Sequence, residues 1–382
     1  MIISSVRTAA FRNLADAVVS TNARNVFLVG KNGQGKTNFL EALYFCAYAS
    51  SFRGVHDCEI AQNGKKDFSA AITAGGSEVL IKYEKGKKYA AVDGKAMENR
   101  RELLSVVPCI VFCHEDLEFV SGSPERQRWF FDQVLSLYDP VYLDDLHRYR
   151  RVVKSRNSVL RDALLRRLDS DPEPLLDAID QQCALYGIRL MEKREQAVAL
   201  FSEIFMSLYE LVSGIAGVQV QYMPSWKESS EAETVSLLRK RRNGDLAAGV
   251  SLSGPHRDRY FFAIDGAAKA DSAKAAADFA ASASTGQRRL LALLLRVAQA
   301  RRFSDMTGRN PILLLDDVLL EMDGEKRRRF LSALPGYDQA FFTFLPEEPF
   351  QHYQGSDTVV YYVQDGRIEE SPVTAAPMAV EQ

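Results

Sequence analysis

Residues 30–37 read Gly30-Lys31-Asn32-Gly33-Gln34-Gly35-Lys36-Thr37. This stretch satisfies the pattern G-x-x-x-x-G-K-[ST] of a phosphate-binding loop. An apolar segment, Val26 to Val29, precedes it, and an amphipathic segment, Asn38 to Tyr48, follows it. Because such a loop needs a strand before it and a helix after it, the context favours a phosphate site over a glycine-rich surface turn.

The residue types in this loop suit phosphate binding. The glycines let the backbone curl, so that successive N–H groups and the positive end of the following helix converge on the phosphates of a nucleotide. We expect Lys36 to meet the β- and γ-phosphate oxygens and the Thr37 hydroxyl to ligate Mg²⁺. The loop therefore predicts a nucleotide with Mg²⁺ as the ligand.

Length and composition limit the architecture and the class of protein. A chain of 382 residues is too long for one compact core of typical size, so we expect two lobes. One lobe inserted into the other is compatible with this expectation. Apolar residues at 46% and charged residues at 26% are typical of a globular protein. A net charge of -2 and a pI near 6.3 argue against a broadly cationic nucleic-acid binder. Any contact with nucleic acid is therefore expected at local basic patches.

The cysteines and the hydropathy indicate a compartment. No secretory apolar region opens the sequence, and no apolar run reaches the roughly 18 to 20 residues of a membrane span. We expect buried thiols in a reducing compartment, no zinc site, no membrane partner and a cytoplasmic location. The five cysteines are Cys46, Cys58, Cys109, Cys113 and Cys183.

Before residue 124 the chain is rich in strand patterns. Alternating apolar segments separated by glycine turns predict an antiparallel appendage on a nucleotide-binding sheet. A near-continuous apolar run, Val106 to Cys113, predicts a strand buried on both faces. The alternating segments are Phe68 to Thr73, Glu78 to Tyr83 and Lys88 to Val92, and a separate short strand pattern, Ile2 to Ala10, opens the sequence.

From about Pro124 the pattern becomes helical. Val141 to Asp171 contains neither Gly nor Pro and predicts one long helix. Leu175 to Val212 predicts a second helix after the break at Pro172 and Pro174. These segments indicate an α-helical arm, and no clean heptad pattern predicts a long coiled coil.

A basic stripe lies on the first of these helices. Arg150, Lys154 and Arg161 stand at offsets of 0, 4 and 11, which place them on one helical face. This face could neutralise DNA phosphates. A solvated face paired with nearby carboxylates such as Asp145 explains the same pattern, and the sequence leaves both interpretations open. A second basic cluster, Arg239 to Arg242, is expected on a loop or a helix end.

Two further segments carry turn and capping signals. Ser253 to Arg259 combines turn formers with charged residues, and a β-turn whose His and Arg only satisfy nearby carbonyls explains it. After the alanine-rich segment Ala267 to Ala283, which we expect to be mobile, Ser284 and Gln287 form a capping box at a helix start. The exposed N–H groups of such a helix start can also bind an anion such as a γ-phosphate.

Two carboxylates end a buried strand near the C-terminus. Asp316 and Asp317 follow the apolar run Pro311 to Leu315. A buried strand tolerates acids at its carboxyl end, where α/β folds place their ligands. Asp316 fits a residue that holds Mg²⁺, and Asp317 fits a base or water-positioning group for attack on the γ-phosphate. Acids that merely cap an unrelated strand are the alternative.

Together these motifs resemble those of the RecF family, bacterial recombination-mediator ATPases related to the SMC and double-strand-break-repair ATPases. The resemblance covers nearly the whole chain, and the motifs are jointly specific. In chain order they are Phe11-Arg12-Asn13, Gly30 to Asn38, Glu115-Asp116-Leu117, Gly122-Ser123-Pro124 with Arg126 and Arg128, Ser253 to Asp258, Ser284 to Arg289, and Leu313 to Asp317.

This resemblance implies an α/β fold: an ABC-type P-loop ATPase head, with a mixed sheet flanked by helices, an antiparallel β appendage and a short inserted helical arm. The implied division is residues 1–123 and 246–370 for the head, 124–245 for the arm and 371–382 for a flexible tail. Two ATP molecules would lie between head-to-tail protomers. The ATP-bound dimer would bind gapped DNA at single-strand/double-strand junctions, work with RecO and RecR to load RecA, and part on slow hydrolysis.

The resemblance also assigns roles to residues. Residues Gly30 to Thr37 would bind phosphates and Mg²⁺, Asp316 would bind Mg²⁺, and Asp317 would promote hydrolysis. Arg12 would lie near the nucleotide. The residues that would reach the partner's γ-phosphate are Ser284, Gly286 and Gln287. The departures from the family pattern are Thr285, His114, Met322 and the alanine-rich segment.

Other classes of ATPase remain open at this level. A transport ATPase would usually show a switch histidine after the strand that ends in Asp316 and Asp317, where this chain has Thr343-Phe344. A small-molecule kinase would have no use for the segment Ser284 to Gln287. Another SMC-like or ABC-type ATPase that does not act at gaps is the remaining alternative.

Overall fold

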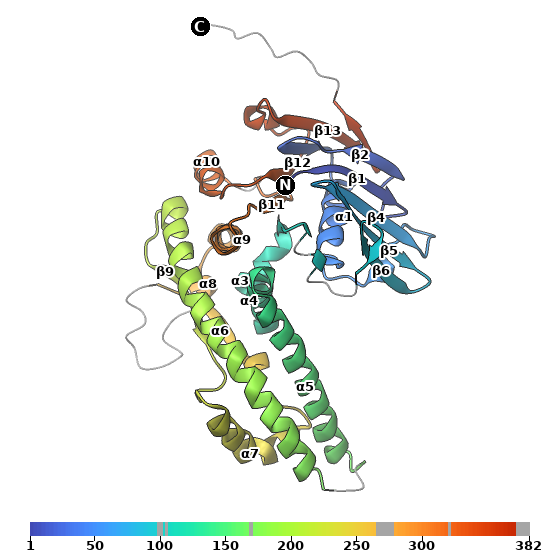
Figure 1. Ribbon diagram of the computed structural model, residues 1–382. Coiled ribbons are helices and arrows are strands. Elements are labelled where there is room, and N and C mark those ends of the chain that lie inside the picture. Colours follow the sequence, from blue (N-terminus) through green and yellow to red (C-terminus); the bar gives the residue numbers. More distant parts are fainter. Residues whose placement is uncertain (98–101, 104–105, 168–170, 265–278, 320–321, 372–382) are drawn as a thin grey trace. The chain divides into compact units, whose positions relative to one another are not determined.

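The computed structural model describes residues 1–97, 102–103, 106–167, 171–264, 279–319 and 322–371. They belong to two compact units (Figure 1). The sheet unit comprises Met1–Glu115, Gly308–Met322 and Pro335–Gln382, and the helical unit comprises Asp116–Thr307 and Asp323–Leu334. Most of the alanine-rich segment, Glu321 and nearly all of the predicted tail lie outside the described residues.

A six-stranded sheet in the sheet unit carries the phosphate loop. Its strand order is β14-β13-β3-β12-β11-β8, and all neighbours are parallel except β14, which runs antiparallel to β13. Its central strands are apolar and buried on both faces, as parallel strands covered by other elements must be. The predicted strands at residues 26–29 and 341–344 are confirmed, whereas the strands predicted over residues 106–113 and 311–317 are both shorter. The bounds are β3 Asn25–Val29, β8 Cys109–Phe112, β11 Ile312–Leu315, β12 Gln339–Phe344, β13 Thr358–Gln364 and β14 Arg367–Glu370.

A second sheet in the same unit is antiparallel throughout, as the alternating segments predict. Its order is β2-β1-β4-β5-β6-β7. Helix α1 (Lys36–Tyr48) contacts β4 and β5 of this sheet and β8 and β12 of the first one. Since α1 meets apolar surface on both sides, it is buried almost all round rather than along one stripe. The bounds are β1 Ile3–Ala9, β2 Ala17–Ser20, β4 Phe68–Ala74, β5 Ser77–Glu84, β6 Lys87–Val92 and β7 Lys95–Ala96.

The helical unit is dominated by two long helices that lie side by side, α5 and α6 (Figure 1). Helix α5 starts at Pro140 and is capped by Asp139, whose side chain accepts a hydrogen bond from the Tyr142 amide. It ends at Leu164, earlier than the predicted Asp171, and α6 then continues for 41 residues. Pro174 lies in the first turn of α6, where proline costs no hydrogen bond. The bounds are α3 Leu117–Ser121, α4 Pro124–Tyr138, α5 Pro140–Leu164, α6 Glu173–Ser213, β9 Val218–Met223, α7 Glu231–Ala248, β10 Arg259–Ile264, α8 Phe279–Ser282, α9 Thr285–Thr307 and α10 Gly324–Ala333.

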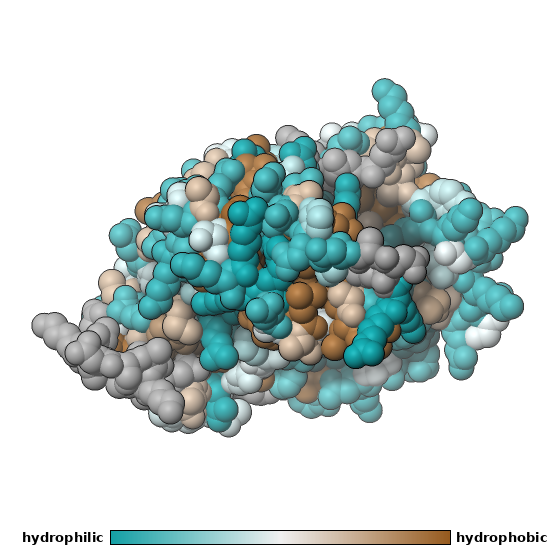
Figure 2. All heavy atoms as spheres, turned by 90° about the horizontal axis from the view of Figure 1, so that it is seen from below, coloured by the Kyte–Doolittle hydropathy of each residue, from teal (hydrophilic) through white to brown (hydrophobic). Residues whose placement is uncertain are grey.

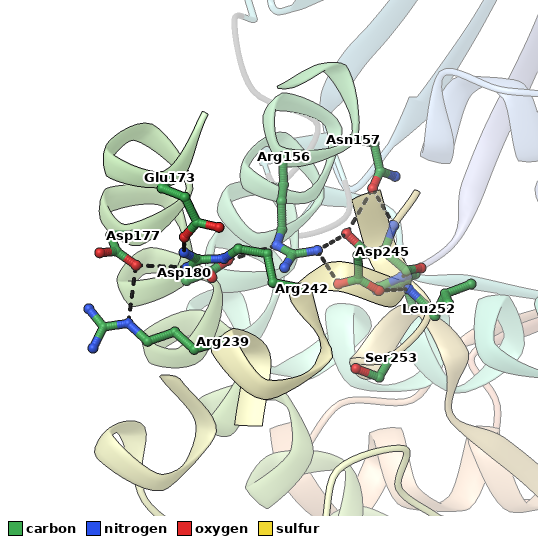
Figure 3. A network of polar contacts seen from close by, with 12 residues as sticks. Arg156, Asn157, Glu173, Asp177, Asp180, Arg239, Arg242, Asp245, Leu252 and Ser253 are labelled. Atoms are coloured by element: carbon green, nitrogen blue, oxygen red, sulfur yellow. Dashed lines mark hydrogen bonds and ion pairs between the residues drawn. The ribbon is translucent and has the colours of Figure 1, made fainter. Parts of the chain in front are cut away.

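A buried ion network joins α5, α6 and α7 (Figure 3). Arg156 donates to Asp180 and to Asp245 at 2.7 Å each, and Arg242 donates to the other oxygen of Asp180 at 2.7 Å. Arg242 is 4% exposed and lies within α7, so the prediction of a loop or helix end for Arg239 to Arg242 is wrong. This arginine joins α7 to α6, because its guanidinium pairs with the buried Asp180 and with the more exposed Glu173 and Asp177.

The cysteine and membrane expectations have different outcomes. Four cysteines are buried free thiols as predicted, but Cys58 is exposed because it lies on the short turn Asp57–Glu59, which has no buried residue. Among the helices that the structure describes, none combines the length and the apolarity needed to cross a membrane.

Candidate nucleotide-binding site

The phosphate loop connects β3 to α1 with a backbone that glycine allows. Gly33 and Gly35 have φ of 78° and 118°, which side chains rarely tolerate. A Cβ on Gly35 would also lie 3.0 Å from Leu14 Cδ2 and 3.1 Å from Asn13 Oδ1. Both the conformation and the close approach therefore require glycine at position 35.

Lys36 lies across the curled loop. Its Nζ donates to the carbonyl of Gly30 at 2.6 Å and to that of Lys31 at 3.2 Å, and the residue is 3% exposed. The loop surrounds a cavity of about 270 Å³. Because the lysine carries its charge into this cavity, the cavity suits a polyphosphate. Its walls are Lys31, Asn32, Gly33, Gly35, Lys36, Thr37, Asn38, Arg53 and Asp317.

The two strand-end carboxylates lie beside this loop. The Thr37 hydroxyl donates to Asp316 Oδ1 at 2.9 Å. The hydroxyl of Thr343, at the end of the neighbouring strand β12, lies 3.2 Å from Asp316 Oδ1 and 2.9 Å from Asp317 Oδ1, and it accepts the Asp317 amide at 2.7 Å. Asp317 has φ of 51°, and such left-handed non-glycine residues cluster at functional sites. One threonine therefore fixes both carboxylates.

The environment of Asp316 suits a divalent cation. Burial, and then the neighbouring charge of Asp317, raises the pKa of Asp316 to about 6, and hydrogen bonds from Thr37 and Thr343 oppose this rise. Hydroxyl and carboxylate oxygens are the ligands that Mg²⁺ prefers. The residues present thus fit a magnesium ion held by Thr37 and Asp316, which would relieve the repulsion between the two carboxylates.

Arg12 lies beside a neighbouring cavity of about 650 Å³ rather than on the wall of the loop cavity. Its guanidinium donates to both oxygens of Glu41, at 3.0 and 2.8 Å, and to the Glu59 carbonyl at 2.9 Å. Glu41 is fully buried in α1, so Arg12 neutralises a buried charge. Arg53, which sequence reasoning did not select, lines both cavities. Its guanidinium nitrogen lies 3.5 Å from a carboxylate oxygen of Glu41.

The turn between β13 and β14 braces the loop, which sequence reasoning also missed. The Gly366 amide donates to the Gln34 carbonyl at 2.9 Å, and the Asp365 amide donates to Gln34 Oε1 at 2.6 Å. A Cβ on Gly366 would lie 1.9 Å from the Asn13 carbonyl oxygen. The side-chain Nδ2 of Asn13 in turn donates to the Gly33 carbonyl at 3.0 Å. The dipeptide Asp365-Gly366 is an ordinary hairpin signal that gives no hint of its partner.

The capping box at the start of α9 is confirmed. The Ser284 amide donates to Gln287 Oε1 at 2.8 Å, and the Gln287 amide donates to Ser284 Oγ at 3.3 Å. Ser284 and Gly286 are exposed, and a Cβ at Gly286 would meet nothing within 4 Å. This helix start belongs to the helical unit, whereas the phosphate loop belongs to the sheet unit.

Comparisons with known proteins agree on one family. The RecF/RecN/SMC N-terminal domain family matches residues 2–368. The DNA replication and repair protein RecF of Treponema pallidum (strain Nichols) is 42% identical over 365 residues, covering 94% of this chain and 99% of that protein. The chain belongs to the RecF family. This membership, predicted from the motifs, decides against the transport and kinase alternatives.

Solved structures of the RecF family and of its SMC relatives share the fold. The structure described as the recombination mediator protein RecF-ATP in the RecFOR pathway superposes with a TM-score of 0.85 at 25% identity, over 97% of both chains. An Smc head domain from Pyrococcus furiosus, at 14% identity and a TM-score of 0.50, shows the fold alone. The predicted ABC-type ATPase head fold is therefore confirmed.

The basic stripe of this RecF-family chain lies on α5. Arg150, Lys154 and Arg161 are all exposed. The face seen in Figure 2 carries many hydrophilic side chains, with smaller apolar patches between them. Arg150 pairs with Asp132 of α4 at 2.9 Å. Asp145, a predicted partner of the stripe, is buried and lies 3.9 Å from Arg189 of α6 instead. The three cations keep the exposure that contact with phosphates requires.

Proposed function

We propose that this protein is an ATP-dependent DNA-binding protein of replication and recombinational repair. Its ATP-bound dimer binds gapped DNA at single-strand/double-strand junctions and, with RecR and RecO, helps to load RecA; slow Mg²⁺-dependent hydrolysis releases the dimer. The observation that carries this proposal is the contact between Thr37 and Asp316, which joins the loop to the carboxylate strand. That contact assembles the two halves of a nucleotide site in one unit.

Each residue of the proposed nucleotide site has its own role. Lys36 and the loop amides bind the phosphates. Thr37 and Asp316 would hold Mg²⁺, which would supply positive charge to offset the charge of the phosphates. Asp317 orients the attacking water, and Thr343 keeps its carboxylate in place. A relative described as an ATP complex supports ATP as the nucleotide.

The dimer forms through the start of α9. Ser284, Gly286 and Gln287 of one protomer contact the γ-phosphate held by its partner, because an exposed helix start offers N–H groups and a positive dipole to an anion. Loss of the γ-phosphate removes this contact. Two copies also combine their basic stripes, which allows a chain of net charge -2 to hold DNA only as a dimer.

A gel-shift assay tests this function. Gapped and blunt duplexes of equal length are each incubated with the protein and ATP, ADP or no nucleotide. We expect a shift that requires ATP and favours the gapped duplex, and we expect Lys36→Ala to abolish it. Equal ATP-dependent shifts of both duplexes would instead support another SMC-like ATPase that does not act at gaps.

A further inference from the structure

A second cavity, of about 380 Å³, lies wholly within the helical unit. Its lining comes from α4, α5 and α6 and from the turn Pro255–Arg257. The turn belongs to the segment Ser253 to Arg259, which the proposed function does not use. None of the lining residues belongs to the phosphate loop.

The floor of this cavity is fixed by a buried arginine. Arg194 is 2% exposed and donates to Asp132, to Asp258 and to the Pro255 carbonyl, at 2.7, 2.7 and 2.8 Å. Tyr222 also donates to Asp258. Because both carboxylates are already held by this network, the positions of the groups above them are set before any ligand arrives.

The wall of the cavity carries surplus positive charge. Four arginines line the cavity: Arg128, Arg150, Arg194 and Arg257. Three carboxylates accompany them: Glu125 and Asp132 in the lining, and Asp258 beneath Arg194. Burial, and then the charge of Arg194, lowers the pKa of Arg128, as expected for cations crowded together. One positive charge is left over, which suits an anion.

The histidine in this wall is a neutral scaffold. His256 Nδ1 lies 2.9 Å from the Tyr149 hydroxyl, and Nε2 lies 3.2 Å from the Ser251 carbonyl. Burial lowers the pKa of His256 to about 4, so Nε2–H donates to the carbonyl and Nδ1 accepts from the tyrosine. The positive charge of the cavity therefore belongs to the arginines.

The remaining lining is apolar and partly aromatic. The Trp129 indole is half-buried and forms one side, and Leu146 and Val153 of α5 form another. An aromatic surface beside guanidinium groups favours a ligand with a flat ring and a phosphate. The volume lies within the usual range for small-molecule sites, roughly 300 to 1,000 Å³.

We propose that this cavity binds one nucleotide unit, with its phosphate on Arg128, Arg150 and Arg257 and its base against Trp129. The unit is a free mononucleotide or the phosphorylated terminal nucleotide of a DNA strand. Arg150 is shared with the basic stripe, so a strand that follows the stripe reaches the cavity. The proposal stands apart from the proposed function, because it requires neither ATP hydrolysis nor the phosphate loop.

Calorimetry with the full chain tests the site. The Lys36→Ala background disables the phosphate loop, and the probes are dAMP, deoxyadenosine and inorganic phosphate. We expect dAMP to bind at least tenfold more tightly than deoxyadenosine and to change the tryptophan fluorescence. Equal affinities for dAMP and deoxyadenosine would overturn the proposal.

Matched variants then locate the binding. Arg150→Gln and Arg257→Gln remove two exposed side chains, so the fold is expected to persist, and circular dichroism checks it. Together they should weaken dAMP binding at least tenfold, whereas Arg151→Gln, an exposed neighbour on α5 outside the cavity, should not change it. If the double variant misfolds, dAMP binding is measured with Arg150→Gln alone. Binding that survives the loss of these arginines contradicts the assignment.

Oligonucleotides distinguish the two sources of the nucleotide. A 5′- or 3′-phosphorylated single strand that binds more tightly than its unphosphorylated twin and than dAMP identifies a strand terminus. Binding of dAMP without any effect of terminal phosphate identifies the free nucleotide. Either result supports the cavity as the binding site only if Arg150→Gln and Arg257→Gln weaken the binding that was observed.

Discussion

Thr37 donates a hydrogen bond of 2.9 Å to Asp316, a residue 279 positions later in the chain. The strand order places β12 between β3 and β11, and all three run parallel. Their carboxyl ends therefore lie at one edge of the sheet, where parallel sheets bind ligands. The proposed nucleotide site is a consequence of this strand order.

Lys36→Ala should abolish ATP-dependent behaviour and leave the fold intact. The substitution removes the one buried cation of the loop and its hydrogen bonds to the Gly30 and Lys31 carbonyls. We would measure ATP affinity by calorimetry and secondary structure by circular dichroism. Lys31→Ala, an exposed lysine of the same loop, should have a smaller effect. Unchanged affinity and hydrolysis in Lys36→Ala would remove the basis of the assignment.

Asp317→Asn should slow hydrolysis at least tenfold while ATP binding persists. Asparagine keeps the contact with Thr343 but lacks the charge that orients water. Single-turnover hydrolysis and equilibrium binding separate the two effects. Loss of binding with normal hydrolysis would mean that the roles of Asp316 and Asp317 are exchanged.

Ser284→Arg should prevent ATP-dependent dimerisation while one chain still binds ATP. A long cation at the exposed start of α9 blocks the approach of the partner's γ-phosphate and breaks the capping box with Gln287. Light scattering gives the mass with ATP and with ADP, and Asp317→Asn, which should remain dimeric with ATP, is the comparison. A dimer of Ser284→Arg as stable as that of Asp317→Asn would rule out this bridge.

Asp316→Asn should stabilise the nucleotide-free protein at neutral pH. The folded pKa of about 6 lies above the ordinary 3.8, so the folded state holds the proton more tightly and ionisation costs stability as pH rises between these values. The free energy of unfolding should rise by on the order of 1 to 2 kcal/mol at pH 8. This is less than the full difference in pKa implies, because the Asp316 carboxylate keeps some contact with solvent.

The pH dependence supplies the control for this variant. At pH 4 the Asp316 carboxyl is protonated in the folded state and about half protonated in the unfolded state, so most of the difference in melting temperature should disappear. Mg²⁺-dependent ATP binding by wild type should also weaken below about pH 6, since protons then compete for Asp316. A stabilisation that is equal at pH 4 and pH 8 would show that its cause is not the charge.

Arg156→Ala should destabilise the helical unit by about 3 to 5 kcal/mol, because it leaves the buried Asp245 without its ion pair and leaves Asp180 with Arg242 alone. Hydrogen exchange of α5, α6 and α7 measures the loss, and ATP binding at the loop serves as an internal reference. Arg239→Ala removes an exposed arginine of α7 and should change little. Protection that is unaffected by Arg156→Ala would show that the network contributes no net stability.

Some features of this protein follow from the sequence because their causes are local. The glycine spacing of residues 30–37, the alternation in residues 68–92 and the capping box of Ser284 and Gln287 each depend on neighbours within a few positions. The family followed from the order of such motifs along the chain.

Other features were decided only by tertiary structure, because they depend on which distant side chains meet. Thr343 links Asp316 to Asp317 only because β12 lies beside β11, and Gly366 braces the loop only because its turn reaches Gln34. The sequence pattern is the same for an arginine in solvent and for one against a buried carboxylate. Packing made Arg242 part of a buried network and left Arg150 exposed, since the stability of a charge depends on its solvent and its partners.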